Sequence, residues 1–265
     1  MSTTSCTTGR QKATTLPSVL VLTPVKNAAA YFDRYVELLG LLDWPRQRLS
    51  LGFLEGDSTD GTWDRLRALK PALQDRARRV TLIKRDFGFR IPPGMPRWAP
   101  PIQQLRRGIL ARARNQLLFR ALRNEDWVLW LDVDVIDYPA DILHRLLATE
   151  FPIVHPHCVI VPGGPTFDRN GWSHHGTRLL EDARGEEAVR LDAVGGTMLL
   201  VKADIHRDGL IFPPFLYGIA NPKIRPTHPV WGQGEIETEG LGIMAQDMGV
   251  QCWGLPNLEI VHMNG

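Results

Sequence analysis

Short apolar runs alternate with segments of helical periodicity along the first third of the chain. Residues 18–27 (SVLVLTPVKN) form a β-branched apolar run that Pro24 interrupts, and a helical pattern follows over residues 28–42. The next predicted elements are a strand at residues 49–54, a helix from Thr62 to about Lys70, and a strand at residues 79–84. Strands that alternate with helices in this way are typical of parallel sheets with right-handed crossovers.

The rest of the chain continues the pattern around one strongly apolar run. Residues 127–131 (WVLWL) are apolar throughout, as in the central strand of a parallel sheet. Residues 86–102 and 211–232 are rich in Pro, which predicts irregular loops. The remaining predicted helices are 103–122, 139–148 and 236–248, and the remaining predicted strands are 152–161, 193–201, 250–253 and 259–262. The pattern predicts an α/β fold with a mostly parallel central sheet and helices on both faces.

Composition narrows the class of protein. The chain has 265 residues, of which 43% are hydrophobic and 23% charged, so we expect a single domain over residues 17–265. Residues 1–16 are polar and rich in Ser and Thr, which predicts a disordered tail. The formal net charge of +2 argues against a nucleic-acid binder. It suits an enzyme that holds a phosphorylated small molecule in one basic pocket.

Cysteine usage and hydropathy bear on location. Cys6, Cys158 and Cys252 match no zinc-site spacing, so we interpret them as buried reduced thiols. Neither a signal peptide nor an apolar run of about 18 residues is present, so we expect no transmembrane helix and a cytoplasmic location. Peripheral contact with a membrane, and assembly with the same or other subunits, are left open.

The segment Asp132-Val133-Asp134 follows the most apolar run. Alternate residues of a strand share one face, so two carboxylates at i and i+2 can converge on one cation. A divalent cation at the carboxyl end of a sheet strand can neutralise a departing nucleoside diphosphate. The alternative is a pair of aspartates that cap the next helix or are solvated. The apolar strand before them favours the metal site.

Three further polar segments are candidates. Residues 55–63 (EGDSTDGTW) follow a predicted strand, but an ordinary turn explains them equally well. The helix at 103–122 carries Arg106, Arg107, Arg112 and Arg114, and a solvated basic face is the common explanation of such a stripe. At most one of Arg112 and Arg114 is expected to reach the site, with Asn115 as a companion.

The C-terminal candidates are Gly195, Gly196, Glu235, Glu237, Glu239 and His262. Glycines before a strand permit the close approach of a ligand, whereas glutamates that open a helix can simply complement its dipole. A lone histidine at a strand end is more often a satisfied surface residue. Spacing alone therefore predicts an α/β enzyme that uses a nucleotide and a metal ion.

Six segments carry a distinctive combination of residues: SVLVLTPVKNAAAYFDRY, RARNQLLFRAL, WVLWLDVDV, GGTMLLVKADIHRDGLIFPPF, IETEGLGIMAQDMG and GLPNLEIVHMN. In these segments the chain resembles the fungal mannan-polymerase family of Golgi α-mannosyltransferases, glycosyltransferase family 62. The resemblance extends from about Ser18 to His262. It implies a GT-A fold, GDP-mannose as donor, Mn²⁺ (or Mg²⁺) as cofactor, and transfer with retention to a carbohydrate or glycoconjugate acceptor.

The resemblance also assigns roles to residues. It implies that Asp132, Asp134 and His262 hold the metal, so His262 is no longer expected to be a surface residue. The implied donor-binding residues are Thr23, Pro24, Asn27, Asp57, Arg114, Asp132, Gly195 and Gly196. Glu237 and Glu239 would face the reaction centre, and together with Asp134 they are the expected catalytic residues, with Glu237 as the candidate base.

Two departures limit what the resemblance implies. The fungal enzymes carry an N-terminal membrane anchor that this sequence lacks, so we expect a bacterial-type member without an anchor. Residues 218–234 resemble an insertion, so acceptor identity is not carried over. An inverting transferase with another nucleotide-sugar, and a non-catalytic subunit that binds donor or glycan within a polymerase complex, remain alternatives.

Overall fold

The fold is known from a computed structural model, which describes residues 16–96, 99–226 and 233–263. The tail predicted at residues 1–16 lies, except for Leu16, outside the described residues. So does part of the irregular segment predicted at residues 211–232. None of the helices among the described residues is both long enough and apolar enough to cross a membrane.

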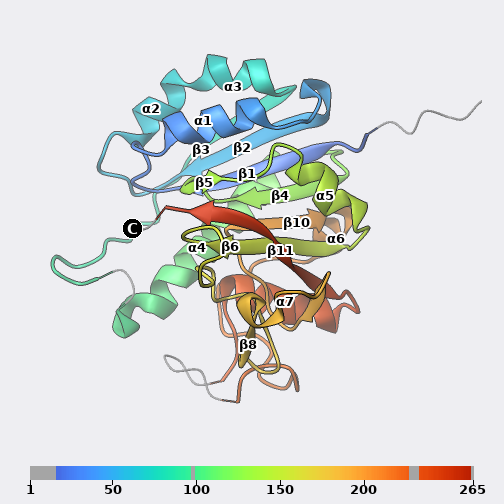
Figure 1. Ribbon diagram of the computed structural model, residues 1–265. Coiled ribbons are helices and arrows are strands. Elements are labelled where there is room, and N and C mark those ends of the chain that lie inside the picture. The colour runs from blue at the N-terminus through green and yellow to red at the C-terminus, as the bar shows by residue number, and fades with distance from the viewer. Residues whose placement is uncertain (1–15, 97–98, 227–232, 264–265) are drawn as a thin grey trace, which may run out of the picture.

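The described residues form one nine-stranded sheet and a two-stranded hairpin (Figure 1). The strands are β1 (Val19–Val25), β2 (Leu49–Glu55), β3 (Arg79–Lys84), β4 (Trp127–Leu131), β5 (Val135–Asp137), β6 (Ile153–Val159), β7 (Trp172–Ser173), β8 (Arg178–Leu179), β9 (Val189–Leu191), β10 (Met198–Lys202) and β11 (Cys252–His262). The large sheet has the order β3-β2-β1-β4-β10-β6-β11-β5, and β9 pairs with β11.

Helices cover both faces of the sheet. They are α1 (Phe32–Leu41), α2 (Thr62–Ala68), α3 (Lys70–Arg76), α4 (Pro100–Ala121), α5 (Ile142–Ala148), α6 (Ala203–Arg207) and α7 (Glu237–Asp247), with 3-10 turns η1 (Arg46–Arg48) and η2 (Leu180–Ala183). Val19 and Val21 of β1 pack in the core that includes α1, α3 and α5. Leu20 and Leu22 pack in the core that includes α4, α6 and α7, because successive side chains of a strand point to opposite faces.

Six strands of the large sheet run in one direction, in agreement with the predicted mostly parallel sheet, and β5, β9 and β10 are antiparallel to their neighbours. β1 is parallel to β2 and β4, β2 is parallel to β3, and β6 is parallel to β11. β10 is antiparallel to both β4 and β6, so β6 and β11 run in the same direction as β4. The strand that was expected to run parallel at residues 193–201 is therefore reversed, and it begins only at Met198.

Several predicted boundaries were wrong for local reasons. The helix predicted to end near Lys70 stops at Ala68, and α3 begins at Lys70. Pro71 lies in the first turn of α3, where a backbone N–H would have no partner within the helix, so the missing N–H of proline costs nothing. Pro100 and Pro101 likewise open α4 three residues before the predicted start. The two predicted closing strands form the single strand β11, with an irregular register between Leu255 and Glu259. Cys158 and Cys252 are buried thiols, as predicted, whereas Cys6 lies outside the described residues.

Close packing of α4 on the sheet generates the first prediction. A Cβ on Gly52 of β2 would lie 2.7 Å from Leu22 Cδ2 and 3.0 Å from Ala121 Cβ. We expect Gly52→Ala to lower the free energy of unfolding by about 1–3 kcal/mol, because overpacking displaces the helix. Urea denaturation measures this.

Gly40→Ala is the matched control. It lies within α1, where an added Cβ meets only the movable end of Arg76, and alanine gains helix propensity of up to about 1 kcal/mol. Equal stabilities of the two variants would contradict the close contact at Gly52.

Candidate active site

The polar segments singled out in the sequence meet at one edge of the sheet. The parallel strands β1, β2 and β4 end there at Val25, Glu55 and Leu131, and residues 26–27, 56–57 and 132–134 follow them. Because β10 is reversed, its beginning lies at this edge, and the Asp132 amide donates to the Thr197 carbonyl at 2.9 Å. His262 ends β11 at the same edge.

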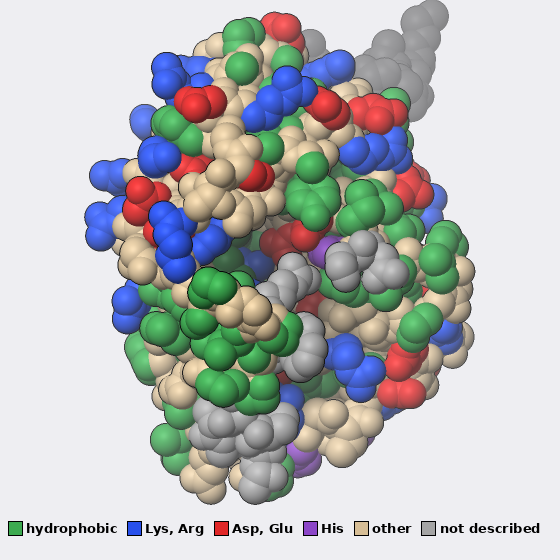
Figure 2. All heavy atoms as spheres, turned by 90° about the vertical axis from the view of Figure 1, so that its left-hand side faces the viewer, with side chains coloured by type: hydrophobic (Ala, Val, Ile, Leu, Met, Phe, Trp, Pro, Cys, Tyr) green, Lys and Arg blue, Asp and Glu red, His purple; other side chains and the backbone are tan. Residues whose placement is uncertain are grey.

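Two adjoining cavities open at this edge. The first has a volume of about 350 Å³ and a largely apolar lining. The second, of about 570 Å³, has a mostly polar lining. Arg106, Leu110 and Asp134 line both. Figure 2 views the molecule from this side and shows the hollow, with acidic side chains and a histidine inside it.

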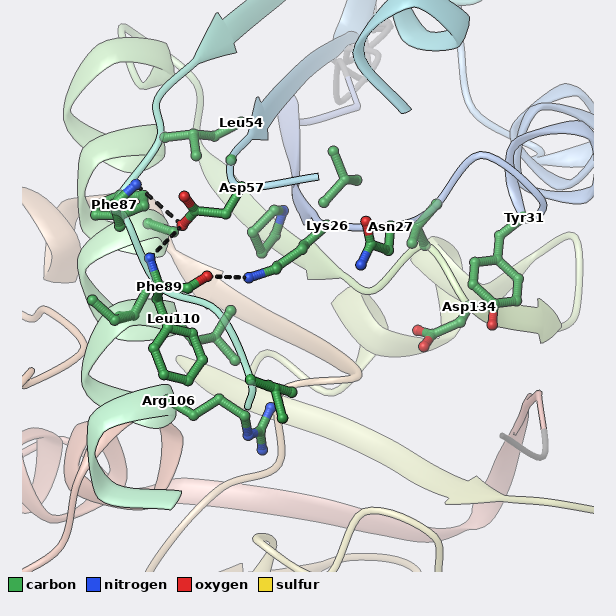
Figure 3. Close-up of a pocket in the computed structure, with 17 residues that line it drawn as sticks. Lys26, Asn27, Tyr31, Leu54, Asp57, Phe87, Phe89, Arg106, Leu110 and Asp134 are labelled. Atoms are coloured by element: carbon green, nitrogen blue, oxygen red, sulfur yellow. Dashed lines mark hydrogen bonds between the residues drawn. The ribbon is translucent and has the colours of Figure 1, made fainter. Parts of the chain in front are cut away.

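Asp57 organises the wall of the first cavity. Its carboxylate accepts hydrogen bonds from the backbone amides of Phe87 and Phe89 at 3.1 and 3.3 Å (Figure 3). It also accepts one from the Gly88 amide at 2.9 Å. Lys26 Nζ donates to the Phe89 carbonyl at 2.8 Å, and this bond joins the loop after β1 to the segment after β3. Asp57 therefore lies at the predicted place, but its carboxylate is already bonded to the protein's own backbone.

The first loop contributes Pro24 and Asn27 to the same cavity. Asn27 has a φ of 50°, a left-handed conformation that asparagine tolerates, and its Oδ1 accepts from the Thr59 amide at 2.9 Å. Thr23 lines neither cavity. It is fully buried, and its hydroxyl pairs with the Tyr35 hydroxyl at 2.6 Å, so the structure corrects the expectation that Thr23 contacts a nucleotide.

Asp132 and Asp134 diverge. The argument from strand alternation fails here because β4 ends at Leu131 and the backbone turns at the two aspartates. Asp132 Oδ1 accepts from Arg114 Nη2 at 3.2 Å, whereas Asp134 Oδ1 lies 3.1 Å from His262 Nε2. Among the described residues, no three His, Cys, Asp or Glu side chains are grouped closely enough to hold a metal ion by themselves. The predicted three-residue ligand set is therefore not assembled in this conformation.

Asp134 and His262 nevertheless fit a divalent cation as a pair. His262 Nδ1 lies 2.6 Å from the Met263 carbonyl, which can only accept, so Nδ1 carries a proton. In the neutral ring the lone pair is then on Nε2, which faces Asp134. A backbone carbonyl that orients the imidazole of a metal ligand is common in metalloproteins. The ring of Phe167 also stacks on His262, with centroids 3.8 Å apart.

The electrostatics of this pair agree with that fit. Burial lowers the pKa of His262, but the hydrogen bond and charge of Asp134 outweigh it and raise the pKa above its usual value. Burial raises the pKa of Asp132 to about 7, against the opposing charge of Arg114, and Asp134 and Asp168 add to the rise. Neighbouring carboxylates contribute to both shifts, although burial is the largest cause of the shift at Asp132.

A chain of largely buried ion pairs runs along one side of the second cavity. We call it the Arg–Glu cluster, and it consists of Asp132, Arg114, Glu237, Arg107, Glu239, Arg225 and Glu235. Arg114 bridges Asp132 and Glu237, Arg107 bridges Glu237 and Glu239, and Arg225 bridges Glu239 and Glu235. The cluster links α4, the start of α7 and the segment before it.

Glu237 and Glu239 thus line the second cavity as partners of arginines, and their predicted place at a reaction centre stays a prediction. Glu239 also accepts from Trp172 Nε1 at 2.8 Å, and Glu237 accepts from the Thr238 hydroxyl at 3.0 Å. Glu237 has a φ of 62°, a conformation that costs a non-glycine residue about 1–3 kcal/mol. The ion pairs with both arginines hold it there.

The glycine pair makes room for protein groups. Asp168 Oδ2 accepts from the Gly196 and Thr197 amides at 2.7 and 3.1 Å, and a Cβ on Gly195 would come within 2.4 Å of that oxygen. A Cβ on Gly196 would lie 2.7 Å from Arg114 Nη1. Gly196 lines the second cavity, whereas Gly195 lines neither, which corrects the expectation that both lie beside a donor sugar.

The sequence analysis did not name Asp168, Trp172 or Arg225, and it interpreted Arg107 as part of a solvated stripe although Arg107 is buried. Helical spacing could have identified Arg107, because it and Arg114 are seven residues apart on one buried face, together with Ala111 and Leu118. Arg112 is exposed, so Arg114 is the one of that pair that reaches the site. Asn115 bonds only the backbone of Phe212, outside both cavities.

Comparison with known proteins identifies the family. The family model described as Anp1 matches residues 1–183 and 174–216. The chain belongs to the Anp1 family. The Anp1-family chain is 29% identical to the mannan polymerase complex subunit MNN9 of Candida albicans, over 93% of this chain and 74% of that protein. It is 28% identical to the mannan polymerase II complex anp1 subunit of Schizosaccharomyces pombe, over 92% of this chain and 64% of that protein. The predicted relationship to mannan-polymerase subunits is therefore confirmed.

Solved structures confirm the GT-A fold. A mannosyltransferase from Pyrobaculum calidifontis, PcManGT in complex with GDP-Man and Mn²⁺, superposes with a TM-score of 0.58 at 19% identity. The match covers 94% of the Anp1-family chain and 57% of that structure. GalNAc-T7 with UDP, GalNAc and Mn²⁺ gives 0.56 at 13% identity, over 95% of this chain and 44% of that one. At these identities the likeness establishes the fold of glycosyltransferases.

The bonds of Asp57 generate the second prediction. Asp57→Ala removes the acceptor of three backbone amides, so we expect the Phe87, Gly88 and Phe89 amides to exchange hydrogen at least about tenfold faster. Asp64→Ala, which removes an exposed carboxylate from α2, should leave their exchange unchanged. Mass spectrometry of exchanged peptides covering residues 86–90 decides, and unchanged exchange in Asp57→Ala would contradict the described wall.

The Arg–Glu cluster generates the third. Arg107→Ala leaves Glu237 and Glu239 each without one buried partner, so we expect a loss of about 3–5 kcal/mol in unfolding free energy. Arg112→Ala on the exposed side of the same helix should change it by less than about 0.5 kcal/mol. Guanidinium denaturation of both variants measures the difference, and a loss below about 1 kcal/mol for Arg107→Ala would show that the cluster is not needed for stability.

Proposed function

We propose that this Anp1-family chain is a metal-dependent mannosyltransferase that transfers mannose from GDP-mannose to a carbohydrate acceptor with retention. The observation that carries the proposal is the Asp134–His262 pair, 3.1 Å apart, with Asp134 lining both cavities. In GT-A-folded enzymes bound nucleotide-sugars have to span a base site and a sugar site. The relatives' names and the GDP-Man in PcManGT support mannose and guanine as the donor's parts.

The two cavities suit the two ends of such a donor. Phe87, Phe89 and Tyr31 offer apolar surface for a base in the first cavity. The second cavity offers charged and hydroxyl groups to sugar hydroxyls, among them Thr197 and Arg114. Arg114 Nε is buried and has no hydrogen-bond partner among the described residues, while its Nη atoms pair with Asp132 and Glu237.

Asp134 and His262 would hold the divalent ion, for which carboxylate oxygen and imidazole nitrogen are suitable ligands. Bound there, Mn²⁺ or Mg²⁺ supplies positive charge to the departing nucleoside diphosphate. Arg114 adds charge from the opposite wall, and Glu237 holds Arg114 in place. The Asp132 carboxylate forms an ion pair with Arg114. Its role is to orient that arginine and to adjust the charge near Asp134.

The hydrogen bonds and ion pairs of the carboxylates near the second cavity help to decide how the anomeric configuration would be retained. Retention needs either a carboxylate nucleophile or attack from the face that the diphosphate leaves. Glu237 and Glu239 are bonded to arginines, and Asp168 is bonded to backbone amides. These contacts favour same-face attack, with the leaving phosphate accepting the acceptor's proton. They also favour a positioning role for Glu237 and Glu239 over the role of base.

A second candidate function is that of a subunit that binds donor or glycan without turnover. It is favoured by the relatives, which are named as subunits of mannan polymerase complexes. Assembly with another subunit is compatible with both functions. Binding of GDP-mannose without release of GDP in the presence of glycan acceptors would select this candidate, whereas an inverted product would select the inverting transferase.

Removal of the proposed metal ligand gives the fourth prediction. With Mn²⁺ and GDP at a hundredfold excess over its dissociation constant, the wild type should gain about 2.7 kcal/mol of apparent stability. Asp134→Asn should weaken Mn²⁺-dependent GDP binding by about 100-fold or more, since metal ligation contributes several kcal/mol. Thermal-shift titration measures both.

Asp137→Asn is the matched control, because this exposed aspartate of β5 lines neither cavity. It should bind as the wild type does. Full Mn²⁺-dependent binding and turnover in Asp134→Asn would refute the metal assignment. A response to UDP-sugars instead of GDP-mannose would refute the donor, and the anomeric configuration of the product, read by NMR, tests retention.

A further inference from the structure

We infer that Arg106 of α4 binds the diphosphate of the donor, at the place where the two cavities meet. The inference rests on the proposed function, because it needs a nucleotide-sugar in these cavities. It assigns a phosphate-binding residue that faces Asp134 from the helical wall of the site.

The position of Arg106 follows from the shape of the site. The residues that line both cavities are Arg106, Leu110 and Asp134. A nucleotide-sugar with its base in the first cavity and its sugar in the second must pass its diphosphate between these side chains. In Figure 3 Arg106 extends from α4 towards the side of the first cavity on which Asp134 lies.

The chemistry of the guanidinium suits this place. Its Nε and Nη2 donate to Gln103 Oε1 at 3.3 and 3.2 Å, so a neutral amide one helical turn away orients the group. Arginine presents a planar set of donors that matches two phosphate oxygens at once, and such charge-assisted bonds are strong.

Helix α4 also contains a matched control for Arg106, namely Arg112. Arg106 and Leu110 are four residues apart, so they lie on the face of α4 that lines the cavities. Arg112 lies on the exposed side of the same helix and lines neither cavity. Replacing either arginine by glutamine removes one charge from the same helix, so the pair separates a local contact from a general electrostatic effect.

The test compares GDP with GMP in the presence of Mn²⁺, by calorimetric titration of the wild type, Arg106→Gln and Arg112→Gln. We expect Arg106→Gln to weaken GDP binding by about 10- to 100-fold and GMP binding by less than about threefold, because GMP lacks the second phosphate. Arg112→Gln should bind both nucleotides as the wild type does. Arg106→Lys, which keeps the charge without the planar fork, should give an intermediate loss for GDP.

Each other outcome overturns the inference. Equal loss of GDP and GMP binding in Arg106→Gln would mean that Arg106 acts on the whole nucleotide or on folding, and the unliganded melting temperature distinguishes these. Wild-type affinity for GDP in Arg106→Gln overturns the role of Arg106 and leaves the proposed function intact. A wild type that binds neither nucleotide overturns both.

Discussion

Buried charge on α4 and α7 is the constraint on which the site depends. Glu235, Glu237 and Glu239 are almost fully buried, and each would be costly without a cationic partner. Arg107, Arg114 and Arg225 supply those partners, from two turns of α4 and from the loop before α7. The cluster contains four carboxylates and three guanidinium groups, so it carries excess negative charge, and burial together with the Glu239 charge raises the pKa of Glu235. The site thus combines rigid ion pairs with a local demand for a cation.

The reversed strand β10 explains how distant segments reach one place. In a purely parallel sheet only strand ends would meet at the carboxyl edge. Reversal brings the beginning of β10, with Gly196 and Thr197, beside Asp132. Asp168 then fastens this turn through the Gly196 and Thr197 amides. The second cavity lies between the end of one strand and the start of another, and helix α4 forms the opposite wall.

Sequence patterns predicted the parts of this structure that depend on local order. Apolar runs such as residues 127–131 identified the strands, and the resemblance identified the family and the GT-A fold. Asp134, His262 and Arg114 were predicted and lie in the cavities. The reversal of β10, the divergence of Asp132 and the burial of Thr23 depend on tertiary pairing, which spacing does not encode. Arg107 was overlooked because a charged residue on a helix usually faces solvent, although its spacing from Arg114 matched a buried stripe.

Helix α4 is held in two ways along its 22 residues. Its C-terminal half lies directly on the sheet, where Ala121 and Leu117 leave space only for the hydrogen of Gly52. Its N-terminal half carries Arg106 and Leu110 over the cavities and is supported at Arg107 by Glu237 and Glu239. Helix α4 is therefore fixed by packing on the sheet at its C-terminal end and supported by ion pairs near its N-terminal end. Because Arg106 and Leu110 line both cavities, a tilt of this helix would move a wall of each cavity at the same time.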